Sequence, residues 1–141
     1  MKLPIEVYKI RRKALVESLR SDVFTQGKNS LMTPKREDVT VENATVVDFD
    51  FCCLGVACIV AGEEPIYDSG RKEWGFKNDT SYNGIETGVL PTSVRQYYNF
   101  STQAANYRNT KLPVDNDRNN MTFLEIADII DSEPDGLFAD A

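Results

Sequence analysis

The chain carries three cysteines and no histidine, and this combination limits the chemistry that its side chains can perform. Without histidine, Ser–His and Cys–His nucleophilic pairs, imidazole acid–base catalysis and His-containing metal sites are excluded. Cys52, Cys53 and Cys58 fall on different faces of one apolar run, where they cannot close a tetrahedral metal site. No base or cation beside them in sequence lowers a thiol pKa. We therefore expect structural thiols, no metal and no cofactor.

Carboxylates are the remaining groups that could support catalysis. Paired Asp and Glu side chains need no histidine, so a carboxylate-dependent hydrolase or transferase is the alternative to a binding protein. The stretch from Asp115 to Asn120 is polar and acidic, but it lacks the twelve-residue spacing and the bidentate glutamate of an EF-hand. Hydrogen bonding within a loop explains these residues better. Gly84 and Gly88 are isolated, so no phosphate-binding glycine loop occurs.

The element that must organise these side chains is the uncharged run 51–62, in a chain that is 27% charged. Its length suits a buried helix of about three turns rather than the ~20 residues that a membrane span requires. Leu54, Ala57 and Cys58 would share one face, and Gly62 is the natural stop. We expect this core helix at the centre of the fold.

Two longer helices are predicted at the two ends of the chain. Residues 5–20 follow Pro4 and form an amphipathic pattern that places Ile10 in the apolar arc. Arg11 also falls inside this arc, either as a snorkelling side chain or as a buried cation kept for an anionic partner. Thr122 and Glu125 have the spacing of a capping box, which predicts a helix that ends before Pro134.

The remaining pattern predicts a small sheet and one domain. Residues 39–49 are rich in β-branched side chains, which favours two short strands with a turn near Asn43. Residues 84–90 are typical of an edge strand, and a short helix should follow Pro91. We predict an α+β fold in which a small, mostly antiparallel sheet packs against three helices. Residues 1–134 form this single domain, and residues 135–141 form a frayed acidic tail.

Binding candidates come from two segments outside the regular elements. Residues 63–83 contain Trp74, Phe76 and Tyr82, so this segment folds over the core, lies in a partner interface or walls a pocket. Residues 101–120 are polar, which predicts a mobile loop held by side-chain hydrogen bonds. Further ligand or partner candidates lie in this second segment: Asn116, Asp117 and Arg118.

Charge is distributed unevenly along a chain with net charge −6. Residues 1–36 hold nine Lys/Arg against three Asp/Glu, whereas residues 115–141 hold eight Asp/Glu against Arg118 alone. The two ends could attract each other within one chain or between chains, and the second case favours a homodimer. The overall acidity argues against nucleic-acid binding. No secretory signal or membrane-length segment is visible, so we expect a cytoplasmic protein without membrane contact.

Five short motifs occur in order over most of the chain: Gln26-Gly27, Phe51 to Val56, Leu90-Pro91, Asn116-Asp117 and Thr122 to Asp128. This order resembles a family of small uncharacterised bacteriophage proteins. The resemblance implies a non-enzymatic accessory protein in the cytoplasm of the infected host cell. Such a protein would bind and neutralise a host component, either a protein or a small nucleotide-like signal, in counter-defence or host takeover.

Two departures from the family pattern matter for function. Ala57 stands where a larger apolar residue is usual, and residues 33–48 form a longer segment than the family has. We therefore consider this longer segment as a place for function that is specific to this member.

Overall fold

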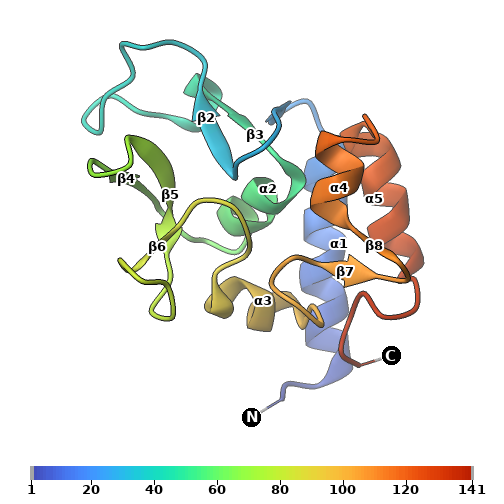
Figure 1. The fold of residues 1–141 in the computed structure, drawn as a ribbon. Coiled ribbons are helices and arrows are strands. Elements are labelled where there is room, and N and C mark those ends of the chain that lie inside the picture. The colour runs from blue at the N-terminus through green and yellow to red at the C-terminus, as the bar shows by residue number, and fades with distance from the viewer. Residues whose placement is uncertain (1, 141) are drawn as a thin grey trace.

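A computed structural model of the chain describes residues 2–140. Its central element is helix α2 (Cys53–Val60), in which every residue from Cys53 to Cys58 is buried. The helix lies between the sheet and the other helices (Figure 1). The chain leaves it through Gly62, whose φ of +90° is readily adopted only by glycine. The predicted core helix is thus confirmed.

One side of α2 faces a six-stranded sheet of order β1-β3-β2-β5-β4, with β6 paired to β5. Only β1 and β3 run parallel, and every other pairing is antiparallel. The sheet and the helices confirm the predicted α+β class. The strands are β1 (Thr25–Gln26), β2 (Met32–Pro34), β3 (Phe49–Phe51), β4 (Pro65–Asp68), β5 (Glu73–Lys77) and β6 (Ile85–Glu86).

The helices gather on the other side of α2 (Figure 1). Helix α1 (Ile5–Arg20) packs against α2, against α3 (Thr92–Tyr98) and along α5 (Phe123–Ser132). The capping box of α5 is confirmed, because Thr122 Oγ1 accepts from Glu125 N at 3.2 Å and Glu125 Oε1 accepts from Thr122 N at 3.0 Å. No helix within residues 2–140 has both the length and the apolar character needed to cross a membrane.

The buried face of α1 differs from the predicted arc. Ile10 is exposed, whereas Arg12 and Val16 are buried beside Tyr8 and Leu15. The prediction placed Arg11 in the apolar arc and left Arg12 out of it. Arg11 is half-buried, and Arg12 is the buried cation, because partners elsewhere in the chain satisfy its guanidinium group.

The two predicted strands in residues 39–49 are also wrong. Residues 35–45 are irregular, a 3₁₀ turn η1 (Val46–Asp48) follows, and strand structure begins only at Phe49. The sheet explains this difference, because β2 pairs with β3 on one side and with β5 on the other. No free strand edge is left beside them, so residues 35–48 form the long connection of a β2–β3 hairpin.

Residues 101–120 contain more regular structure than a mobile loop. They form a hairpin of β7 (Asn106–Tyr107) and β8 (Thr110–Lys111), followed by helix α4 (Leu112–Asp117). Tyr107 and Leu112 anchor the segment in the core. The expected side-chain hydrogen bonds do occur, and the one between Tyr107 and Asp115 is buried.

The frayed tail is a further correction. Leu137 and Phe138 are buried, Ser101 N donates to Leu137 O at 2.9 Å, and the ring of Phe138 stacks on that of Phe100 at 4.8 Å. Burial of these two apolar side chains offsets the cost of ordering the acidic segment around them. Residues 135–140 therefore belong to the domain, and residue 141 lies outside the described part.

Candidate functional site

Residues from three of the five motifs meet in one polar cluster. Gln26 Nε2 donates to Asn116 Oδ1 at 2.9 Å and to Met121 O at 2.7 Å, while its Oε1 accepts from Phe123 N at 3.2 Å. Asn116 Nδ2 in turn donates to Gly27 O at 2.8 Å. We call Gln26, Gly27, Asn116, Asp117 and Phe123 the motif cluster.

Close packing explains the glycines of these motifs. A Cβ on Gly55 would lie 1.8 Å from Leu31 O, and a Cβ on Gly27 would lie 2.8 Å from Asp50 Cβ. Only glycine fits at the first position without moving the backbone. The motif cluster therefore ties β1, α4 and the start of α5 together, and these buried bonds indicate a structural role.

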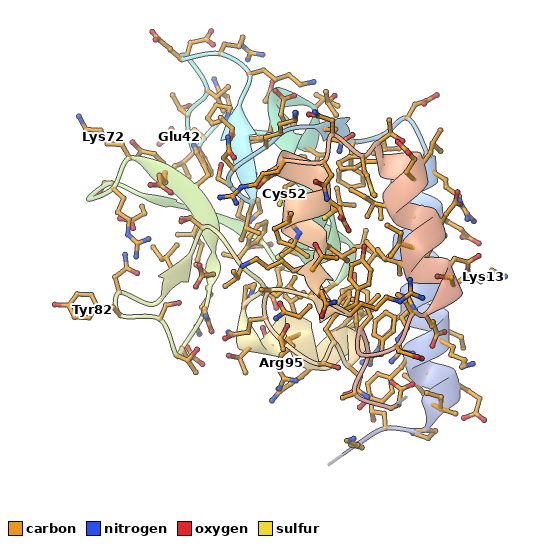
Figure 2. All side chains as sticks on the ribbon, turned by 45° about the vertical axis from the view of Figure 1, so that its right-hand side comes forward. Lys13, Glu42, Cys52, Lys72, Tyr82 and Arg95 are labelled. Atoms are coloured by element: carbon orange, nitrogen blue, oxygen red, sulfur yellow. The ribbon has the colours of Figure 1, made fainter. Side chains whose placement is uncertain are left out.

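Cys52 lies just before α2, close to this cluster (Figure 2). Desolvation raises the pKa of Cys52 to about 12, and it raises the pKa values of Cys53 and Cys58 well above their ordinary range. All three thiols therefore stay protonated at neutral pH. Because the thiolate is the reactive form of cysteine, these thiols are not activated as nucleophiles. Their environment matches the packing role inferred from the apolar run.

Asp115 is the most deeply buried carboxylate of the polar segment. One of its oxygens accepts from the hydroxyl of Tyr107 and the other from Asn119 Nδ2 at 3.0 Å. Burial and this hydrogen bond raise the pKa of Tyr107. These bonds hold the β7–β8 hairpin against α4. Within residues 2–140, no group of three Cys, Asp or Glu side chains is arranged to hold a metal ion.

An open hollow lies where the long β2–β3 connection passes over the sheet. A cavity of about 580 Å³ is bounded by residues of the connection together with Tyr67, Lys72 and Trp74. We call residues 35–47 with these three side chains the loop face. Figure 2 places Glu42 and Lys72 at the same rim of the molecule. The cavity volume lies within the range of about 300–1,000 Å³ that is usual for ligand pockets.

Aromatic packing forms the floor of the loop face. Trp74 is buried against Phe49 at 4.9 Å between ring centroids, and Tyr67 covers it at 5.4 Å. A smaller apolar hollow of about 340 Å³ lies beneath the connection and shares Trp74 and Val41 with the larger one. Val41 therefore lies between the two cavities.

Polar contacts shape the connection above this floor. Arg36 pairs with Asp38 at 2.7 Å and with Asp48 at 3.0 Å, and Thr45 N donates to Asp48 Oδ2 at 2.9 Å. The Thr45 backbone bond is the main cause of a lowered pKa at Asp48. Arg36 and Asp38 are exposed, so each such pair contributes little to stability. The C-terminal end of the connection, around Asp48, is thus held more firmly than its middle.

The other predicted binding residues lie apart from one another. Arg11 lines a separate cavity between α1 and α3, and Phe76 is fully buried in β5, where its ring serves the core. Tyr82 projects from the β5–β6 connection into solvent (Figure 2). Asn116 and Asp117 belong to the motif cluster, whereas Arg118 is exposed at the end of α4.

Sequence reasoning named Trp74 and considered residues 33–48 as a place for function, but it did not bring the two together as one face. Val41 gave no signal by itself, because a single valine in a polar segment is ordinary. The unusual length of the segment was the usable signal. No protein family model, no curated protein and no solved structure matches this chain.

Proposed function

We propose that this chain is a non-enzymatic accessory protein, of bacteriophage origin, that binds and neutralises a host protein through the loop face. The observation that supports this proposal most is the pairing of an aromatic floor with exposed apolar side chains on an irregular connection. Val41 is 64% exposed and lines the hollow over Trp74 and Tyr67, and Val47, on the same connection, is 66% exposed. Apolar and aromatic groups beside a pocket are the usual anchor points of protein interfaces.

Charge at the rim favours a protein over a nucleotide at this face. Lys35, Arg36 and Lys72 line the cavity, but Glu37 and Glu42 line it too. A phosphate group entering the cavity would meet both carboxylates, whereas the mixed pattern suits a protein surface that carries both signs. A partner side chain of aromatic size would fill the space over the floor.

The alternative of carboxylate catalysis has weaker support. Glu37 and Glu42 bring two carboxylates to one cavity, but both are exposed. Solvent weakens the electrostatic effects on which acid–base catalysis by such groups depends. Asp115 is buried, but both of its oxygens already accept hydrogen bonds within the fold.

Capture from a lysate of the host bacterium tests the proposal when it uses matched variants. The test variants are Val41→Asp and Tyr67→Ala. Their controls are Val23→Asp, at a valine that is 59% exposed outside the loop face, and Tyr82→Ala. A hot-spot change costs at least about 2 kcal/mol, so we expect the captured amount to fall about thirtyfold for the test variants only.

Two results would refute the proposal. The first is that both pairs of variants capture the same protein equally well. The second is that no host protein is retained in an amount that rises with the amount of immobilised chain.

A second copy of this chain is the other partner to consider. Arg20 pairs with Asp128 at 2.8 Å and with Asp131 at 3.7 Å, so part of the opposite charge at the two ends is already paired within one chain. The predicted homodimer would then need the apolar loop face rather than charge. Light scattering at low and high salt distinguishes the cases, because an apolar dimer persists in salt.

A further inference from the structure

A second cavity, on the far side of α2 from the loop face, collects positive charge. It has a volume of about 610 Å³ and lies between the start of α1 and the outer face of α3. Lys2, Arg11 and Arg95 line it, and no carboxylate is among its lining residues. In a chain with net charge −6, such a concentration of cations requires an explanation.

In the part of the chain that the structure describes, the arginines of this cavity combine partial burial with the lack of an acidic partner, whereas Arg108 and Arg118, which also lack one, are exposed. Arg12, Arg20 and Arg36 each pair with a carboxylate within 4.0 Å. Across residues 2–140, neither Arg11 nor Arg95 has such a partner. Both side chains are half-buried, so water screens them less than it screens a surface arginine.

Arg11 is held in place by Tyr97 rather than by an acid. Its guanidinium carbon lies 4.1 Å from the centre of the Tyr97 ring, and its Nη1 donates to Tyr97 O at 2.9 Å. A guanidinium group has five N–H donors, and stacking fixes the plane in which the others point. The group is therefore oriented before any anion arrives.

Arg95, on the α3 side of the cavity, is held by a hydrogen bond to the backbone. Its Nη1 donates to Phe100 O at 3.1 Å, which leaves its other N–H groups without a protein acceptor in the described chain. Figure 2 shows Arg95 on the outer side of the α3 region. Ser93, Gln96 and Asn99 add neutral polar groups to the lining.

Two acids bond to residues that line the cavity, and neither enters its lining. Glu63 accepts from Ser93 Oγ at 3.2 Å, and Asp140 accepts from Asn99 Nδ2 at 3.0 Å and pairs with Arg12. Neither carboxylate lines the cavity. An anion in the cavity would thus meet donors and cations at its walls.

We propose that this α1–α3 cavity binds the phosphate group of a small phosphorylated molecule. Arginine forks match the oxygens of phosphate, and two oriented guanidinium groups with one lysine can surround a dianion. The volume exceeds that of phosphate alone, so the Tyr8 ring and Leu3 offer a wall for an organic part. The site is independent of the loop face and of any protein that binds there.

Calorimetric titration of the whole chain at low ionic strength tests this proposal. The probes are sodium phosphate and adenosine 5′-monophosphate, with sodium acetate as a control for charge screening. The variants are Arg11→Met, Arg95→Met and the nearly isosteric Gln96→Glu, which places a carboxylate at the cavity wall without removing a fold contact. Arg118→Met, at an exposed arginine outside the cavity, is the matched control.

We expect each cavity variant to weaken phosphate binding about tenfold or more, because each loses or opposes a charge-assisted hydrogen bond. Arg118→Met should bind as the wild type does. Tighter binding of the nucleotide than of free phosphate would assign a role to the apolar wall, and equal binding would assign the site to the free anion. Absence of binding by both phosphates, equal binding of acetate, or no effect of Gln96→Glu would overturn the proposal.

Discussion

Among the charged side chains of α1, Arg12 is the one whose replacement by methionine should destabilise the fold most. The Arg12 side chain is 3% exposed, and its Nε donates to Tyr98 O at 3.0 Å. Its Nη1 pairs with Glu133 at 2.9 Å, its Nη2 pairs with Asp140, and its guanidinium carbon lies 3.7 Å from the centre of the Phe138 ring. One cation therefore joins α1, α3 and the C-terminal segment.

The magnitude follows from what each partner loses. The buried Tyr98 carbonyl loses a charge-assisted bond worth about 1.5–3 kcal/mol, and the stacking on Phe138 is worth up to about 2 kcal/mol when desolvated. Glu133 and Asp140 have side chains 33% and 20% exposed, so water replaces part of their lost pairing. Because these contributions are not additive, we expect a loss of about 3–5 kcal/mol, as for other buried pairs that lose one partner.

Urea unfolding followed by circular dichroism measures this change. Lys13→Met is the matched control, since Lys13 is the next residue on α1 and projects into solvent (Figure 2). We expect that control to change the unfolding free energy by no more than about 0.5 kcal/mol. Arg12→Lys should not restore stability, because an ammonium group cannot reproduce the planar fork. Equal unfolding free energies for Arg12→Met and Lys13→Met would refute the reasoning.

Three further predictions concern the same core. The hydrogen bond from Arg12 lowers the pKa of Asp140 below its unfolded value. The stabilisation that the Asp140 carboxylate gives to the fold is therefore complete above about pH 4 and is lost as the pH falls through the lower folded pKa. Asp140→Asn should flatten the acid side of a stability–pH curve measured by thermal unfolding. Asn116→Ala should cost about 1–3 kcal/mol for each buried group it leaves unpaired, and unchanged urea unfolding would show that the motif cluster is not structural. Gly55→Ala places a methyl 1.8 Å from Leu31 O, so we expect at least about 1–3 kcal/mol of destabilisation in the same assay, and wild-type stability would contradict the close packing.

The parts of the fold that sequence reasoning found are those with local signals. The run 51–62 is uncharged, which only a buried element explains, and the capping box at Thr122 and Glu125 is complete within four residues. Neither signal depends on residues far away in the chain. The predicted ends of α2 at Gly62 and of α5 before Pro134 also rest on local signals.

The parts that it missed depend on distant partners. Arg12 has the spacing of a buried residue between Tyr8 and Leu15, but nothing local shows that Glu133 and Asp140 come to it. The order of residues 135–140 depends on the same contacts. The β-branched residues of 39–47 gave a strand signal that failed because the strands on either side of this segment in sequence, β2 and β3, pair with each other and are paired on their other edges too.

The candidate sites were only partly visible for a related reason. Trp74 and Arg11 were named as single residues, but a cavity is a property of several segments that sequence order does not place together. The loop face needs Val41 from the β2–β3 connection and Tyr67 from β4, and the α1–α3 cavity needs Arg11 together with Arg95.

Hydrogen exchange of the captured complex tests the proposed function most directly. Backbone amides in residues 35–45 lie outside helix and strand pairing, so in the free protein they should exchange quickly, apart from those that donate hydrogen bonds within the connection: Lys35, Thr40, Asn43 and Thr45. With the host protein bound, we predict that these amides and those of Tyr67 become protected, while those of the exposed Tyr82 connection do not change. Protection elsewhere, with residues 35–45 still exchanging as in the free chain, would contradict the assignment of the loop face as the binding surface.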